Sequence, residues 1–230
     1  MGMLIAAALF FLAIHLLVSG TSVRDVVVGA LGERPYQGLF SVASLGAIIW
    51  LALSYNTALA QGSMVLWDLG PAVRHVGVVV VAIAFLFAVT GLLTPNPTTV
   101  GMEGRAAHTE TVKGVLRITR HPFLWGVALW AAFHVLANGD AASIVFFGTF
   151  LLLAALGTYS IDVKRARKMG DAWQGFARKT SNLPFAAIAS GRNTLKLNEL
   201  LTYRQAVALI VFLGFLFAHE RLFSASPFAG

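Results

Sequence analysis

The feature that most constrains this chain is a series of six long apolar stretches separated by polar segments. Each stretch approaches or exceeds the roughly 17–25 residues with which an α-helix crosses the hydrocarbon core of a bilayer. Only 12% of the residues are charged and the mean hydropathy is +0.76, whereas about a quarter of a soluble domain is charged. The sequence therefore predicts an all-α fold, an integral membrane bundle of about six transmembrane helices.

The 230 residues leave room for one bundle and for no separate soluble domain, so we expect a single domain over residues 1–230. The turn Asn138-Gly139-Asp140 predicts a tight antiparallel hairpin between the fourth and fifth spans. Two longer loops are expected at 94–121 and 161–204. The predicted spans lie near residues 3–20, 38–60, 71–93, 122–138, 140–160 and 205–223.

Lysine and arginine are distributed very unevenly between the two sides of the predicted bundle. The loops after the first, third and fifth spans carry 15 of the 17 basic residues, and the other side carries only Arg74 and Arg221. Basic loops stay in the cytoplasm, so both termini are expected on the outer face. The net charge of +7 then reflects topology and indicates no nucleic acid partner. We expect a multi-pass protein of a bacterial inner (plasma) membrane.

The segment 161–180 mixes lysine and arginine with Trp173 and Phe176. That composition is typical of an interfacial amphipathic helix that lies against anionic lipid headgroups. An ordinary positive-inside loop with a helical tendency would have the same composition. Membrane lipids are therefore expected partners of this segment, and the alternative stays open.

The candidate chemistry is carried by histidine, because the chain has no cysteine and so no disulfide, thiolate ligand or cysteine nucleophile. An ionisable group inside a membrane is costly and marks a functional position by default. His15 lies within the first predicted span and His134 lies near the outer end of the fourth. Each is a candidate metal or haem ligand, and each could instead serve as a proton relay or simply bond to a neighbouring helix.

His121 differs from this pair because it precedes Pro122, where the fourth helix is expected to begin. Proline is favoured at the first helical position, and the free amides of a helix N-terminus attract anions. Arg117 and Arg120 add positive charge. We therefore predict an anion site at these three residues, for haem propionates, a phosphate or a cofactor carboxylate.

The other three histidines are more typical of interfacial or solvated positions: His75, His108 and His219. His75 nevertheless remains an alternative ligand. His15 lies towards the cytoplasmic half of its span and His134 towards the outer face, which at 1.5 Å per residue separates them by about 10 Å in depth. His75 matches the depth of His134 better. Two neutral imidazoles on different helices are suitable axial ligands of a b-type haem.

Several ordered motifs resemble the NnrU family of membrane proteins, which includes the plant and cyanobacterial 15-cis-zeta-carotene isomerases. They are HLLVSGTSVRD, GERPYQGLF, RITRHPFLWG, AFHVLANGD and FARKTSNLPFAAIASGR. The resemblance implies haem b, with His15 and His134 as axial ligands and catalytic residues and with His121 as the histidine of the RHP motif. The isomerase branch has a cysteine where this chain has Ala131, so no thiolate can replace a ligand here.

The resemblance implies two functions for a haem-binding protein. One is cis-trans isomerisation of a polyene (carotenoid-like) substrate, a lipid-soluble small molecule that arrives from the bilayer. The other is a part in nitrogen-oxide reduction (denitrification), with which the bacterial members are associated.

Two alternatives remain. The RHP motif also resembles that of membrane methyltransferases, in which Arg117, Arg120 and His121 would hold S-adenosylmethionine, although Asp162 stands here without the downstream glutamate pair of those enzymes. The last alternative is a non-catalytic assembly factor with a reductase partner.

Overall fold

The computed structural model describes residues 1–108 and 111–228, and within these ranges the regular structure is helical, without a β-strand. The helices are joined by short turns and by irregular segments at both ends of the bundle. In chain order the elements are α1 (Gly2–Ala13), the π-helical turn η1 (Ile14–Val18), α2 (Val23–Leu31), α3 (Glu33–Ala60), α4 (Ala72–Leu93), η2 (Glu103–Ala107), α5 (Val115–Ile118), α6 (Pro122–Asn138), α7 (Ala141–Met169), α8 (Asp171–Lys179), α9 (Ala186–Ala189), η4 (Leu197–Glu199) and α10 (Tyr203–Phe223).

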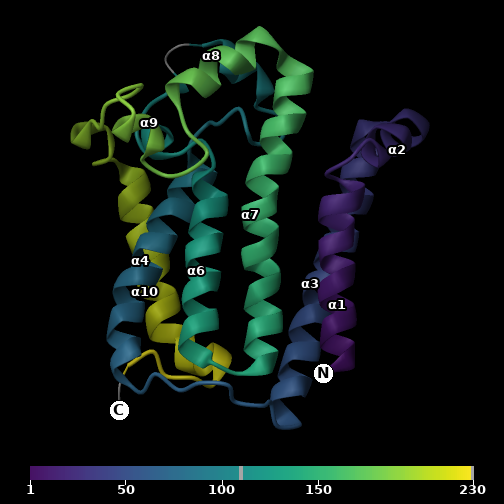
Figure 1. Ribbon diagram of the computed structural model, residues 1–230, viewed down its shortest axis with the longest axis vertical. Coiled ribbons are helices and arrows are strands. Elements are labelled where there is room, and N and C mark those ends of the chain that lie inside the picture. Colours follow the sequence, from purple (N-terminus) through teal and green to yellow (C-terminus); the bar gives the residue numbers. More distant parts are fainter. Residues whose placement is uncertain (109–110, 229–230) are drawn as a thin grey trace.

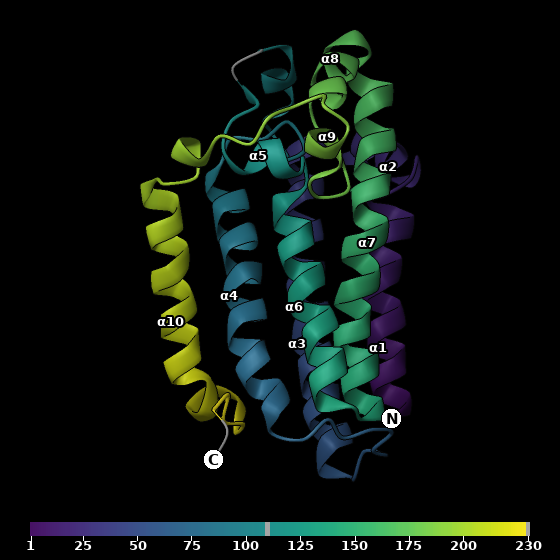
Figure 2. The ribbon, with the colours of Figure 1, turned by 60° about the vertical axis from the view of Figure 1, so that its left-hand side comes forward.

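The long helices run side by side as a bundle (Figures 1 and 2). Helix α6 packs between α4 and α7, α10 covers α4, and α1 and α3 form a pair that packs on α7. Helices α2, α8 and α9 lie at one end, whereas Met1 and the end of α10 lie at the other (Figure 1). The basic loops therefore gather at the end of the bundle opposite Met1 and the end of α10, which agrees with the predicted topology.

Four described helices are long and apolar enough to cross a membrane: α3, α4, α7 and α10. The segment Gly2–Val18 joins α2 with a bend of 77°, and this broken pair makes a fifth candidate span. Helix α6 is apolar but has 17 residues, at the lower edge of the length that crosses a bilayer. The all-α membrane bundle is confirmed, and the number six stays a prediction.

Helix boundaries differ from the expected spans where the sequence contains no helix breaker. Helix α7 continues nine residues past the expected end at 160, because nothing interrupts the run until Gly170, whose φ of +51° ends the helix. Residues 23–31, expected as a loop, form α2. The hairpin between α6 and α7 is confirmed: Gly139 is left-handed at φ +67° and the Asp140 carboxylate accepts from the amides of Ala142 and Ser143.

Small residues allow the helices of the bundle to approach one another closely. A Cβ added to Gly126 of α6 would lie 2.5 Å from the backbone nitrogen of Ala88 in α4. A Cβ on Gly91 would lie 2.5 Å from the Phe123 nitrogen. This backbone-to-backbone contact is typical of membrane helices, where small residues favour association. It fixes α6, which carries His134 and is directly preceded by His121.

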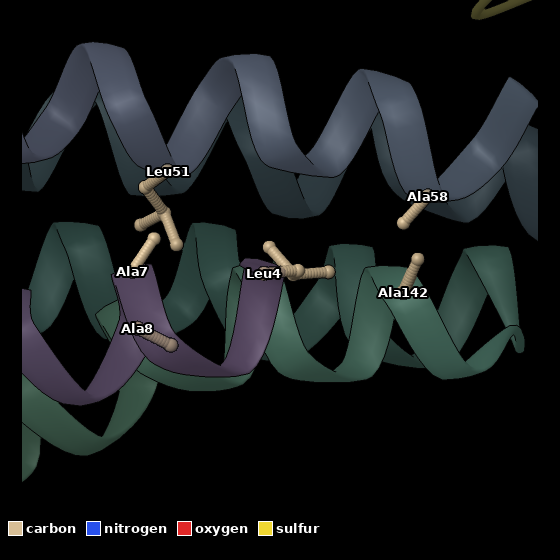
Figure 3. Packing of buried hydrophobic residues seen from close by; sticks show 6 residues of the cluster. All are labelled: Leu4, Ala7, Ala8, Leu51, Ala58 and Ala142. Atoms are coloured by element: carbon tan, nitrogen blue, oxygen red, sulfur yellow. The ribbon is translucent and has the colours of Figure 1, made fainter. Parts of the chain in front are cut away.

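A second interface joins α1, α3 and α7 (Figure 3). Figure 3 shows Leu51 of α3 against Ala7 of α1, and Ala58 of α3 opposite Ala142 of α7. The buried cluster consists of Leu4, Ala7, Ala8, Leu51, Ala58 and Ala142. The packing holds the amino-terminal pair of helices on α7, so that His15 is attached to the rest of the bundle.

The segment 161–180 differs from an interfacial amphipathic helix. Its first half belongs to α7, and α8 turns back over the end of the bundle. Trp173 and Phe176 are 4% and 3% exposed and pack with Ala106 and Val112. Its largest apolar side chains therefore form a small protein core instead of facing lipid.

Candidate functional site

His15 lies in η1, the π-helical turn that ends the straight part of the first helix. Its Nδ1 donates to the carbonyl oxygen of Phe11 at 2.8 Å, and Ser44 Oγ of α3 is 3.4 Å from Nε2. The rings of Phe11 and Phe40 flank the imidazole, with centroid distances of 4.3 and 5.2 Å. Single π-turns within α-helices occur frequently at functional positions, so the backbone itself marks this histidine.

His134 occupies an equivalent environment on α6. Its Nδ1 bonds to the carbonyl oxygen of Trp130 at 2.8 Å, and its ring stacks on Phe147 of α7 with centroids 4.7 Å apart. The Trp130 indole lies 5.0 Å away. The residues around this imidazole are aromatic and apolar, with no carboxylate in hydrogen-bond contact among the described residues.

The two histidines share one feature that suits metal ligation. Each donates Nδ1–H to the carbonyl four residues earlier, which fixes the tautomer and leaves Nε2 as the nitrogen with a lone pair, to which Ser44 Oγ is the neighbour in His15 at 3.4 Å. Ligating histidines almost always make such a second bond. The donor chemistry of His15 and His134 therefore fits the axial positions of a haem, for which neutral imidazole is suited.

The two histidines do not contact each other, but a series of aromatic ring contacts connects them. Phe11 lies against His15 and is 5.5 Å from Phe150, and Trp130 lies against His134 and is 5.7 Å from Phe150. His15 and His134 thus belong to one aromatic cluster contributed by α1, α6 and α7. The difference in depth between the two histidines stays a prediction.

His121 has a different environment, at the end of the bundle where α6 begins. It is 2% exposed, and its Nε2 donates to Asp162 Oδ1 of α7 at 2.7 Å. Arg120 donates to the same carboxylate through Nε and Nη2, at 2.9 and 2.7 Å, and Asn182 Nδ2 donates at 3.2 Å. Asp162 is thus the acceptor on which three side chains converge.

Backbone hydrogen bonds hold the segment 119–121 to the segment 181–182 beside Asp162. The Arg120 amide donates to the Ser181 carbonyl at 2.9 Å, and Thr119 Oγ1 donates to the Asn182 carbonyl at 2.6 Å. Trp125 Nε1 bonds to that carbonyl as well, at 2.8 Å. The RHP motif and the FARKTSN motif, some 60 residues apart in sequence, therefore form one structural unit.

Burial lowers the pKa of His121 below its ordinary value, and the Asp162 hydrogen bond opposes this with a smaller effect. Among the described residues no group bonds to the buried Nδ1 of His121. A proton on Nδ1 would create a buried donor without an acceptor. The neutral imidazole is therefore the form that this environment favours.

Arg117 is bound to a second carboxylate. It holds Glu199 through Nε and Nη2 at 2.7 and 3.0 Å, and Nη1 donates to Asn193 Oδ1 at 2.8 Å. The Arg117 hydrogen bonds lower the pKa of Glu199 to about 2. An anion at the predicted site of Arg117, Arg120 and His121 would have to compete with Glu199 and Asp162, and the site stays a prediction.

The remaining histidines lie at the surface. His75 and His108 are exposed, and His219 Nδ1 bonds to the Ala225 carbonyl at 2.7 Å. Within residues 1–108 and 111–228 no three histidine, aspartate or glutamate side chains gather to hold a metal ion. His15 and His134 are two residues, so they do not form such a group of three.

Sequence reasoning named Asp162 only as the acidic residue in a weak methyltransferase match, and it missed Asn182 and Glu199. One signal was present for Asp162, because it is the only carboxylate among the basic residues at the end of α7. No local pattern marks Asn182 or Glu199, whose partners lie 20 and 82 residues away.

Comparison with known proteins places these residues in a family. The NnrU protein family matches residues 3–227, nearly the whole chain. This chain belongs to the NnrU family. The resemblance inferred from the sequence motifs is therefore confirmed, and the histidines and the RHP unit described above are features of an NnrU protein.

Two curated relatives are plant enzymes. The chloroplastic 15-cis-zeta-carotene isomerase of Arabidopsis thaliana is 29% identical over 226 residues, covering 95% of this chain and 59% of the relative. The Zea mays enzyme of the same name is 28% identical over 116 residues, covering 49% of this chain and 32% of the relative. The chain thus spans less than two thirds of the length of either relative. No solved structure matches it.

Proposed function

We propose that this protein binds haem b within the membrane and isomerises a cis double bond of a lipid-soluble polyene. The observation that carries the proposal is the common arrangement of His15 and His134: in each, Nδ1 bonds to the carbonyl four residues earlier, and no carboxylate of the described residues bonds to Nε2. The names of the two plant relatives supply the reaction class. The bacterial inner membrane stays a prediction, since both relatives are chloroplastic.

In this proposal His15 of η1 and His134 of α6 would hold the haem. A bound haem would supply iron, which could lower the barrier to rotation about a double bond if one of the two histidines left it. Phe11, Trp130 and Phe150 provide flat apolar faces suited to a conjugated chain. Helices α1 and α3 expose apolar side chains such as Leu9 and Leu45, at 62% and 61%, and this outer surface suits a substrate that arrives from lipid.

The absorption spectrum of the purified protein tests haem binding. We expect a Soret band and a six-coordinate low-spin spectrum for the wild type. Both should be largely lost in His15→Ala and in His134→Ala. His75→Ala is the matched control, because His75 is an exposed histidine at the first turn of α4. Full haem content in both ligand variants would refute this ligand pair, and haem loss in the control alone would favour His75.

Turnover requires a separate assay. The haem-loaded protein in bilayers is incubated with a 15-cis polyene, and the isomers are separated by chromatography. We expect conversion that depends on protein and is lost in His134→Ala. Haem binding without conversion would contradict the isomerase assignment and would favour a role in nitrogen-oxide reduction or in reductase assembly. Co-purification with a reductase would then distinguish these.

A further inference from the structure

A small cationic cavity lies where α4 and α10 reach the end of the bundle that carries the basic loops. Its volume is about 190 Å³, below the roughly 300–1,000 Å³ of pockets for drug-sized ligands. The side chains that matter for its chemistry are Arg105, Lys113, Glu199, Thr202, Arg204 and Gln205. A cavity of this size and lining suits a single charged headgroup.

The charge of the lining favours an anion. Among the described lining residues three side chains are cationic, namely Arg105, Lys113 and Arg204, and the carboxylate of Glu199 is in a bidentate pair with Arg117. Because Arg117 keeps the pKa of Glu199 at about 2, the carboxylate stays ionised and bound to Arg117 at neutral pH.

Arg204 joins the cavity to the two transmembrane helices. Its Nε donates to the carbonyl oxygen of Leu93, the last residue of α4, at 3.1 Å. A guanidinium has five N–H donors in a rigid fork, so the terminal amino groups can still bind phosphate oxygens. Gln205 accepts from Thr202 through Oε1, which leaves its amide NH₂ as a further donor.

The surface beside the cavity is apolar and faces outward. Leu201 is 84% exposed, Tyr203 66% and Leu92 64%. Helix α10 stands at the edge of the bundle, with α4 as its neighbour (Figure 2). A polar cavity at the ends of two spans, flanked by exposed apolar side chains, reproduces the order of a lipid: charged headgroup, then hydrocarbon.

We propose that this cavity binds the phosphate of an anionic phospholipid in the leaflet that faces the basic loops, with the acyl chains against α4 and α10. The site does not depend on the function proposed above. It also replaces segment 161–180 as the place of lipid recognition, since Trp173 and Phe176 are buried within the protein. A phospholipid headgroup and a free phosphate ion present the same phosphate group to the cavity. The position of the cavity at the ends of two spans favours the lipid.

Native mass spectrometry of the protein extracted from vesicles of mixed phosphatidylglycerol and phosphatidylcholine tests the site. We expect retention of phosphatidylglycerol, reduced about fivefold or more in Lys113→Gln and in Arg204→Gln and restored in part by Arg204→Lys. The matched control is Lys168→Gln, an exposed cation in the last turn of α7 on the same side. Thermal unfolding in detergent shows whether each variant is folded.

Three results would overturn the proposal. Equal retention of phosphatidylcholine would show that charge is not recognised. Unchanged phosphatidylglycerol in Lys113→Gln and Arg204→Gln would place the lipid elsewhere. If inorganic phosphate raised the thermal unfolding temperature as much as short-chain phosphatidylglycerol does, the cavity would be a site for free phosphate. Haem content is measured in the same samples, so a failure of the haem proposal is seen separately.

Discussion

The two ends of α6 carry histidines with opposite environments. His121, just before the helix, is 2% exposed and is bonded to Asp162 within a network that includes Arg120 and Asn182. His134, one turn from the other end, has one hydrogen bond to its own helix and otherwise contacts aromatic rings. The first arrangement joins loops to the bundle, whereas the second leaves Nε2 available. The difference teaches that the hydrogen-bond partners of the second ring nitrogen, and not proximity to a transmembrane helix, distinguish a structural histidine from a candidate ligand.

The largest expected effect separates the two histidines by haem content. His134→Ala should reduce haem per protein more than tenfold, because an axial ligand is lost, while His121→Ala should leave the haem content of the folded fraction near that of wild type. Pyridine haemochrome absorbance on protein purified by size exclusion measures both. Equal haem loss in the two variants would remove the distinction between the ends of α6.

The next effect tests the network at the start of α6. Asp162→Ala removes the acceptor shared by Arg120, His121 and Asn182, and it should reduce the free energy of unfolding by about 2–4 kcal/mol, because buried donors lose their partner. Denaturant unfolding in detergent provides the measurement. Asp171→Ala is the control, an exposed carboxylate at the first turn of α8. A similar small effect of both substitutions would show that the network contributes little to stability.

A third prediction concerns the packing that positions both histidines. Gly126→Ala forces a Cβ against the backbone of Ala88 and Ala84 in α4, so it should destabilise the protein by about 1–3 kcal/mol. Gly148→Ala in α7, whose Cβ would meet nothing within 4 Å, should be neutral or slightly stabilising. Thermal unfolding of the two variants compares them. Equal unfolding temperatures would mean that α4 and α6 separate readily.

The smallest expected effect is the pH dependence of His121. Burial lowers its pKa in the folded protein, so the unfolded chain binds more protons as the pH falls below about 6.5. Stability from this group is therefore complete above that pH and is lost as the pH falls from about 6.5 towards the lower folded pKa. His121→Gln should flatten the unfolding temperature between pH 7 and 5. If the unfolding temperature of this variant changed with pH as steeply as that of the wild type, the pH dependence would belong to other groups.

Part of the fold could be predicted from local sequence. The turn at Asn138-Gly139-Asp140 specifies the hairpin of α6 and α7, because glycine adopts the left-handed conformation and aspartate caps the next helix. The end of α7 could not be placed, since IDVKRARKM contains no breaker and reads equally as a loop. The environment of Trp173 and Phe176 could not be decided from the sequence, because Val112, which belongs to the same buried cluster, lies more than 60 residues earlier.

The sequence by itself determined the membrane class, the distribution of charge between the two ends and the family, and it singled out His15, His121 and His134 as candidates, because each follows from composition or from contiguous motifs. Only the tertiary structure decided what these histidines contact. It linked His121 to Asp162 and placed His15 and His134 in one aromatic cluster, since hydrogen bonds and ring contacts depend on which helices meet. It also revealed the cavity of Arg105, Lys113 and Arg204, because residues about 100 apart in sequence become neighbours only when α4 and α10 pack.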